Sequence, residues 1–209
     1  LEWIRLFGVL FNREQQANEF FKEQAERIQP ILEKENTGLS VAFFAVSSDG
    51  TITVRKPNDY VSSMIELAGG NYSLNGYLPE EDSALSTMKM QMEDFYVAEK
   101  DADILIYNGT IEGELTSVDE LIAKNSLFAD FKAVKSGQVY TTGSNFYQQT
   151  SMTCDFIEDL NKVLIGSDDT DYHFLKHILQ GHYPKKLFSL KKETVTSLFF
   201  SLVITNKCI

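Results

Sequence analysis

The chain has 209 residues, of which 43% are hydrophobic and 12% aromatic, and this composition fits a folded globular protein rather than a disordered one. The formal net charge of −11 argues against a general nucleic-acid binder or a protein held on anionic lipid, because both functions need a basic face. Two cysteines, Cys154 and Cys208, are too few for a disulfide framework or a cysteine-rich metal site.

The first part of the chain predicts two helices followed by a hairpin. A helix over 1–11 leads into a second over 13–35, in which apolar side chains recur every three or four residues. The continuous apolar run 39–46 is typical of a strand that is buried on both faces. A turn at 48–50 then predicts an antiparallel return strand over 51–54.

The middle of the chain predicts an alternation of helices and strands. Helices are expected over 59–68, where a pair of glycines ends the pattern, and over 86–99. The segment between them is loop-like, with a short strand near Tyr72. The second helix leads into an apolar strand over 103–107, which Asn108-Gly109 ends.

The last part predicts a helix over 117–123, a strand over 138–141 and a helix over 149–164. A peripheral tail with a helix near 171–180 is expected after residue 166. Strand, loop, helix and strand in this order are typical of parallel β–α–β units. The sequence therefore predicts an α/β fold, a three-layer lobe with a mostly parallel central sheet.

The common catalytic and nucleotide-binding signatures do not occur in the sequence. It contains no phosphate-binding Gly-rich loop and no Gly-x-Ser-x-Gly elbow. His173 and His177 have the spacing with which one helix face can chelate a metal, although a solvated surface helix is the favoured interpretation. The acidic pairs are interpreted as solvated faces. We therefore expect neither an enzyme nor a protein-bound metal site.

Aromatic residues fall where a ligand would meet such a sheet. Tyr107 ends a strand, Tyr60 lies in the first turn of a helix, and Phe146 and Tyr147 follow a strand. If the strands are parallel, these positions share one edge of the sheet. A purely structural role for each aromatic residue on its own stays open. Three polar residues offer a cation and amides near this edge: Arg55, Asn58 and Gln148.

Several short segments of the sequence follow one another in the order that a known protein family shows. They are 1–8, 14–21, 57–60 with 66–72, 103–107 and 133–140. Together they resemble the carboxy-terminal lobe of the periplasmic-type substrate-binding proteins of iron-siderophore, haem and cobalamin ABC transporters. The resemblance implies the end of an inter-lobe connecting helix at 1–12, a carboxy-terminal α/β lobe at 13–165 and an atypical tail at 166–209.

The resemblance also implies what the protein binds and where. The ligand, a ferric siderophore or a similar metal chelate, would lie between two lobes, and the loaded protein would dock on an ABC transporter permease. The expected location is extracytoplasmic, as a periplasmic protein or a cell-surface lipoprotein. Eight residues of this chain are implied as one wall of the ligand cleft: Arg55, Asn58, Tyr60, Tyr107, Asn108, Phe146, Tyr147 and Gln148.

Two further expectations and two alternatives accompany this interpretation. The other lobe is not recognisable in the sequence, so we expect the chain to be a fragment that meets a membrane only through an anchor of the full-length protein. The segment 185–209, basic and then apolar, is a hypothetical start of a membrane segment. One alternative function is a metal-cluster reductase component, which would need cluster-ligating cysteines. The other is a protein-interaction domain that uses the same loop edge.

Overall fold

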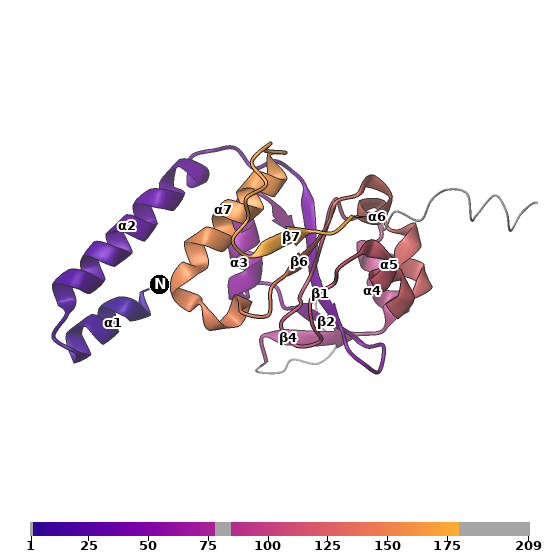
Figure 1. The fold of residues 1–209 in the computed structure, drawn as a ribbon, viewed down its shortest axis with the longest axis horizontal. Helices are drawn as coiled ribbons and strands as arrows, with labels where there is room; N and C mark the ends of the chain where they lie inside the picture. Colours follow the sequence, from indigo (N-terminus) through magenta and orange to yellow (C-terminus); the bar gives the residue numbers. More distant parts are fainter. Residues whose placement is uncertain (1, 78–84, 180–209) are drawn as a thin grey trace, which may run out of the picture. The chain divides into compact units, whose positions relative to one another are not determined.

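A seven-stranded sheet forms the centre of the structure, a computed structural model that describes residues 2–77 and 85–179 (Figure 1). The strands are β1 (Ser40–Val46), β2 (Ile52–Arg55), β3 (Asn71–Tyr72), β4 (Thr87–Met90), β5 (Ile104–Tyr107), β6 (Val139–Thr142) and β7 (Leu175–His177). Their order across the sheet is β4-β2-β1-β5-β6-β7, and β3 pairs with the start of β1.

The middle of the sheet is parallel and its two ends are antiparallel. Strands β3, β1, β5 and β6 pair in parallel, whereas β2, β4 and β7 join by antiparallel ladders. In β1 the six residues after Ser40 are all buried, as expected of a strand with helices on both faces. The predicted α/β class with a mostly parallel core is therefore confirmed.

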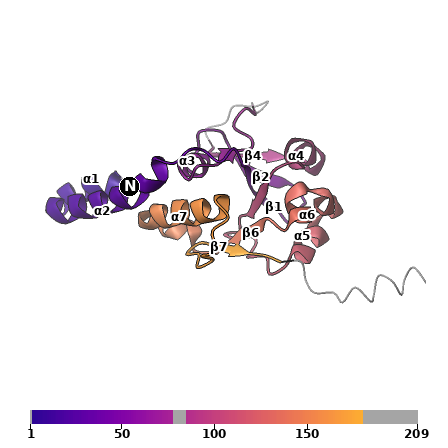
Figure 2. The same cartoon turned by 90° about the horizontal axis from the view of Figure 1, so that it is seen from above.

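Helices cover both faces of this sheet and make three layers. The helices of the described residues are α1 (Trp3–Leu10), α2 (Glu14–Leu32), α3 (Tyr60–Leu67), α4 (Met92–Glu99), α5 (Val118–Lys124), α6 (Lys132–Ser136) and α7 (Thr153–Leu164), with 3-10 turns at Ser126–Asp130, Phe146–Gln148 and Thr150–Met152. Figure 2 shows α3 and α7 on one side of the sheet and α4, α5 and α6 on the other.

Two aromatic clusters fill the two interfaces between helices and sheet. Because successive side chains of a strand point to opposite faces, neighbouring phenylalanines in β1 serve different layers. Phe43 contacts Phe146 on the α7 side, with ring centroids 5.9 Å apart. Phe44 packs against Phe95 and Phe128 on the α4 side, at 4.9 and 5.4 Å. This alternation decides which residues can reach the site described below.

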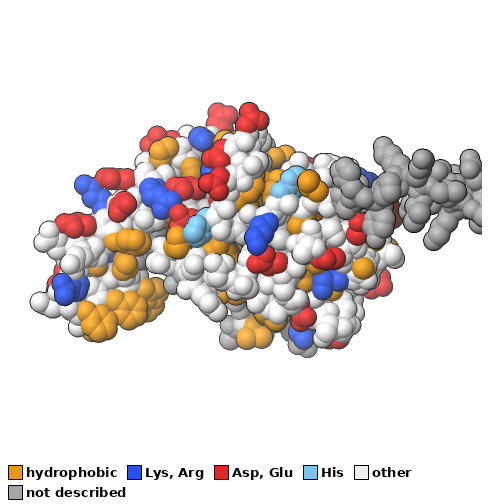
Figure 3. Space-filling view, viewed as in Figure 1, with side chains coloured by type: hydrophobic (Ala, Val, Ile, Leu, Met, Phe, Trp, Pro, Cys, Tyr) orange, Lys and Arg blue, Asp and Glu red, His pale blue; other side chains and the backbone are white. Residues whose placement is uncertain are grey.

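Helix α1 packs on α2 and leaves most of its own apolar side chains exposed. Gly8 makes the close approach possible, since a Cβ there would collide with the Ala17 side chain. The side chain of Arg5 bonds Asn18, with its Nε 3.0 Å from the amide oxygen. Figure 3 shows apolar side chains gathered over α1, and the exposed members are Trp3, Leu6, Phe7, Val9, Leu10 and Phe11.

The helix predicted over 86–99 is wrong in its first part. Thr87–Met90 form the edge strand β4, and the helix begins only at Met92. Met88 and Met90 are buried while Lys89 between them is exposed, which is the period of a strand. This alternation is visible in the sequence, but the run of good helix formers conceals it.

The helix predicted near 171–180 is also wrong over the described residues, because Leu175–His177 form β7 against β6. The buried carboxylate of Asp159 on α7 accepts backbone N–H groups of His173, Phe174 and Leu175, at 3.0, 2.7 and 3.2 Å. These bonds hold the segment extended, and it belongs to one compact unit with residues 1–165.

The membrane-like segment expected at 185–209 lies outside the described residues. Among the helices of 2–77 and 85–179, none combines the length and the apolar character that crossing a bilayer requires.

Candidate ligand-binding site

The candidate site is centred on a buried cation between two tyrosines. The guanidinium of Arg55, at the end of β2, lies 4.9 Å from the ring centroid of Tyr147 and 5.1 Å from that of Tyr60. The two rings meet edge to face, with centroids 6.5 Å apart. Aromatic faces attract a cation through their quadrupole, so the three side chains stabilise one another. We call them the Arg55–tyrosine group.

Hydrogen bonds fix Arg55 from the neighbouring elements. Its Nη1 donates to the Ser86 hydroxyl at 3.0 Å, and its Nη2 donates to the Tyr60 hydroxyl at 3.3 Å. The Asp59 carboxylate lies 3.6 Å from Nη1. Burial alone would lower the pKa of Arg55, but the two tyrosines and Asp59 outweigh it and raise the pKa above its usual value. The residue is 7% exposed, and its side chain stays charged.

The start of α3 places Tyr60 in this group. Asp59 is the N-cap residue, and its carboxylate accepts the backbone N–H of Val61 at 3.1 Å. Burial raises the pKa of the Tyr60 phenol to about 12, against the opposing effect of Arg55. Tyr60 is therefore a neutral hydrogen-bonding ring at physiological pH, with half of its surface open to a ligand.

The loop after β5 holds the second tyrosine. The Asn108 amide nitrogen donates to the Tyr147 hydroxyl at 2.8 Å, and the amide oxygen accepts from the Thr110 hydroxyl at 2.7 Å. Gly109 allows this turn because any Cβ there would collide with the Thr142 carbonyl oxygen. The ends of β5 and β6 are thereby joined at one edge of the sheet, where ligands of open α/β sheets bind.

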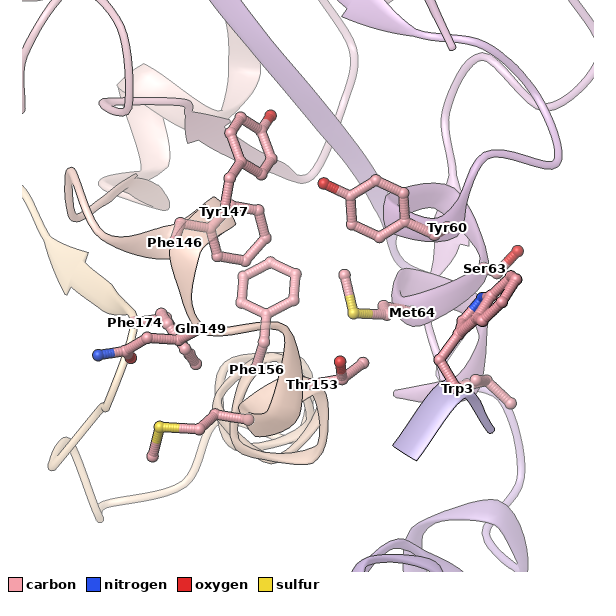
Figure 4. A pocket seen from close by; sticks show the side chains of 12 residues that line it. Trp3, Tyr60, Ser63, Met64, Phe146, Tyr147, Gln149, Thr153, Phe156 and Phe174 are labelled. Carbon is pink, nitrogen blue, oxygen red and sulfur yellow. The ribbon is translucent and has the colours of Figure 1, made fainter. Parts of the chain in front are cut away.

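Two hollows flank the Arg55–tyrosine group, and Tyr147 lines both. The smaller, about 180 Å³, is here called the polar pocket; its polar lining residues are Ser47, Thr53, Arg55, Thr87, Asn108, Glu112 and Tyr147. The larger, about 590 Å³, is here called the apolar pocket and is shown in Figure 4. Its lining consists of Trp3, Tyr60, Ser63, Met64, Leu67, Phe146, Tyr147, Gln149, Met152, Thr153, Phe156 and Phe174.

The sequence of the chain matches one known protein family. The family described as periplasmic binding protein matches residues 1–146, well over half of the sequence. The chain belongs to the periplasmic binding protein family. This confirms the resemblance on which the expected lobe and ligand wall were based.

The family's relatives and solved structures agree with this affiliation. An uncharacterized lipoprotein of Methanocaldococcus jannaschii is 24% identical over 78% of this chain and 38% of its own length. A second uncharacterized protein of that organism is 24% identical over 84% of this chain and 54% of its own length. The chain therefore spans about half the length of these relatives, or less.

Solved structures of the family share the fold at low sequence identity. The ABC-type Fe³⁺-hydroxamate transport system of Saccharomonospora viridis aligns with a TM-score of 0.64 at 18% identity, over 78% of this chain and 53% of that one. The periplasmic haem-binding protein of Vibrio cholerae aligns with a TM-score of 0.59 at 12% identity, over 76% and 58%. At these identities the likeness concerns the fold alone.

The structure brings together five of the eight predicted site residues of this family member. They are Arg55, Tyr60, Asn108, Phe146 and Tyr147. Phe146 is buried and forms part of the floor of the apolar pocket. Tyr60 and Tyr147 flank the Arg55 cation, and Asn108 bonds the Tyr147 hydroxyl.

Tyr107, Asn58 and Gln148 do not join this group. Tyr107 pairs with Phe44 across the β1–β5 ladder and packs against it edge to face at 5.8 Å, on the opposite face of the sheet from Phe43. The sequence predicted that Tyr107 lies at a strand end, but the side of the sheet to which its ring points depends on the register between β1 and β5. Asn58 adopts a left-handed turn conformation, with φ of 62°, and Gln148 points to solvent; both are exposed and line neither pocket.

Sequence reasoning missed most of the apolar pocket. Ser63, Met64 and Leu67 follow Tyr60 at steps of three, four and seven residues, and this helical spacing would have placed all four on one face of α3. Trp3 gave no such signal, because it lines this pocket from a distant part of the sequence.

The two histidines considered as metal ligands each contact a different hydrogen-bond partner. His177 Nε2 is 2.6 Å from the Gly137 carbonyl oxygen, and its ring stacks on Tyr140. His173 Nε2 is 3.2 Å from the Gln149 side-chain oxygen. Within 2–77 and 85–179, no three His, Cys, Asp or Glu side chains gather in a way that could hold a metal ion.

Proposed function

We propose that the full-length protein binds a metal chelate outside the cytoplasm for import by an ABC transporter, and that this chain supplies one wall of the binding cleft. The ligand we propose is a ferric siderophore or a related metal complex. The second wall belongs to the part of the relatives that this chain does not span. The chelated metal is cargo, so the protein itself needs no cofactor for this role.

The observation that carries the proposal is the Arg55–tyrosine group at the ligand edge of a periplasmic binding protein fold. A guanidinium, two phenol rings and the amide of Asn108 offer charge, stacking and hydrogen bonds within one small area. Such groups bind a bulky polar chelate reversibly, without proton transfer or a nucleophile.

The related proteins support the ligand class and the location. Solved neighbours are described as an Fe³⁺-hydroxamate transport system and a haem-binding protein, and curated relatives are described as lipoproteins. We therefore propose a periplasmic or cell-surface lipoprotein that passes its chelate to a membrane permease.

The reductase alternative finds no support at Cys154. This thiol is buried, burial raises its pKa, and its sulfur lies 3.5 Å from the Gln24 carbonyl oxygen. A buried thiol of this kind behaves as a small core residue rather than as a cluster ligand.

Calorimetric titration with ferric hydroxamates, haem and cobalamin tests the proposal, on the full-length protein and on this chain. We expect one of these ligand classes to bind, and Arg55→Lys to weaken its binding by about tenfold, because lysine keeps the charge but loses the planar stack. Arg13→Gln, which changes an exposed arginine at the start of α2, should bind as the unmodified protein does. If the full-length protein binds none of the three classes, the proposal is wrong.

A further inference from the structure

The apolar pocket differs in chemistry from the polar pocket beside it. All of its lining side chains are uncharged at neutral pH, and half of them are aromatic, whereas the polar pocket contains Arg55 and Glu112. An ion or a chelated metal centre would lose its hydration in the apolar pocket without gaining an opposite charge. The chemistry of this pocket therefore suits an uncharged apolar group.

The floor of the apolar pocket is already packed. Phe146 lies 4.6 Å from Phe156 and 5.6 Å from Phe174, measured between ring centroids, and all three are buried. Figure 4 shows the rings of Phe146 and Phe156 facing the side of the cavity formed by Tyr60 and Met64. Since these rings hold one another, a ligand group would enter a preformed pocket and would not have to order it first.

The rim of the pocket is open and apolar. Trp3 is 71% exposed, Tyr60 51% and Leu67 42%, although each contributes to the lining. A pocket of about 590 Å³ lies within the range that holds a small organic ligand or a large part of one.

The two pockets adjoin at the Arg55–tyrosine group. Tyr147 lines both, and the Arg55 guanidinium that faces the polar pocket lies over the two tyrosine rings that border the apolar one. A ligand that contacts these rings from the polar side therefore has the apolar pocket directly beside it.

We propose that the apolar pocket is a second subsite, which takes an aromatic or branched hydrocarbon group of the same chelate whose polar, metal-binding part lies against the Arg55–tyrosine group. This inference rests on the proposed function and narrows it to an amphiphilic chelate. A purely hydrophilic chelate would leave the apolar lining in contact with water and would bind more weakly.

Trp3 offers a direct reporter of this subsite. It is the only tryptophan of this 209-residue sequence and lines the apolar pocket, so the tryptophan emission of this chain reports on that pocket. An apolar group that enters beside Trp3 removes water from the indole, and the emission should then shift to shorter wavelength.

A matched pair of probes separates the two subsites. Gallium(III) tris(benzohydroxamate) and gallium(III) tris(acetohydroxamate) are uncharged and share the same metal–oxygen centre, but the first carries phenyl rings where the second carries methyl groups. Gallium stands in for iron because it does not quench tryptophan by itself. We expect the phenyl complex to bind about tenfold more tightly and to shift the Trp3 emission, in proportion to the extra apolar area buried.

Two variants locate the preference in the pocket. Leu67→Asp brings a charge to the rim, and Ser63→Phe fills the cavity from a half-buried position on α3; each should remove most of the preference for the phenyl complex. Val97→Asp changes an apolar side chain that is 75% exposed on α4, lines neither pocket, and should preserve the preference. Thermal melting of each variant confirms that it is folded.

The outcomes distinguish the inference from the proposed function. Equal affinity for the two complexes in the full-length protein, or a preference that survives both pocket variants, would overturn the apolar subsite and leave chelate binding in place. If neither these complexes nor the ferric hydroxamates, haem and cobalamin bind, the proposed function fails and the subsite falls with it.

Discussion

The Asn108 amide nitrogen lies 2.8 Å from the Tyr147 hydroxyl, so a residue that ends one strand orients a ring that follows the next. The same ring lies over the Arg55 guanidinium and borders both pockets. Because the Asn108 oxygen is held in turn by Thr110, the amide cannot rotate freely. The proposed ligand wall is thus fixed by polar bonds at its centre and by packing at its edge.

Asn108→Ala should weaken chelate binding by about fivefold to tenfold, since a hydrogen bond of this kind contributes about 1 kcal/mol. The variant leaves the Tyr147 ring present but no longer oriented. Calorimetric titration measures the affinity. Asn18→Ala, which removes an exposed side-chain bond to Arg5, serves as the matched control, because neither residue lines a pocket. Unchanged affinity of Asn108→Ala would remove this bond from the binding wall.

Tyr107→Phe tests the assignment of Tyr107 to the core rather than to the cleft. Its hydroxyl is buried and has no hydrogen-bond partner within the described residues, so removing it should leave the free energy of unfolding unchanged or raise it by up to about 1 kcal/mol. Urea unfolding measures this, and chelate affinity should not change. Tyr147→Phe, in contrast, loses the bond to Asn108 and should weaken binding. A loss of affinity in Tyr107→Phe would return Tyr107 to the site.

The sequence was sufficient for the parts of the fold that depend on local pattern. Local residues alone predict three of these parts: the strand at the apolar run of β1, the end of α3 at the glycine that follows it, and the end of β5 at Asn108-Gly109. The meeting of Asn108 and Tyr147 at one edge followed from the parallel order of β5 and β6, whereas Arg55 and Tyr60 follow β2, which is antiparallel to β1 and was not placed by that rule.

What could not be predicted depended on contacts between distant segments. Tyr107 and Phe43 lie on opposite faces because of the β1–β5 register, which sequence alone does not fix. The strand at Leu175–His177 forms because Asp159, about 15 residues earlier, binds its backbone. The apolar pocket needs Trp3 beside α3 and α7, and no local pattern indicates that meeting.

Asp159→Ala should destabilise the fold by about 3 kcal/mol, because it leaves two buried backbone N–H groups and one part-buried N–H group without an acceptor. The loss should be concentrated in β7, where hydrogen exchange of the Leu175 and Lys176 amides should accelerate before that of β5. Asp169→Ala, an exposed aspartate after α7, is the matched control and should change stability little. If β7 keeps its protection in Asp159→Ala, the carboxylate does not hold that strand.

Glu99 gives the fold a dependence on pH that has a defined sign. Its carboxyl group is fully buried, one oxygen accepts the Ser73 hydroxyl at 2.8 Å, and the other has no hydrogen-bond partner among the described residues. Burial raises the pKa of Glu99 from 4.5 to about 7, although the Ser73 bond opposes the shift. Between these two values the folded state binds more protons than the unfolded state. The stability that Glu99 contributes is therefore present at pH 4.5 and lost as the pH rises towards 7.

Glu99→Gln should abolish this slope, because glutamine stays neutral and can still accept the Ser73 bond. The free energy of unfolding of the unmodified protein should fall by about 3 kcal/mol between pH 4.5 and 7.5 relative to the variant. Urea unfolding across this range measures the difference. Glu93→Gln, which changes an exposed carboxylate on the same helix, should keep the slope of the unmodified protein. A Glu99→Gln slope equal to that of the unmodified protein would show that folding does not raise the pKa of Glu99.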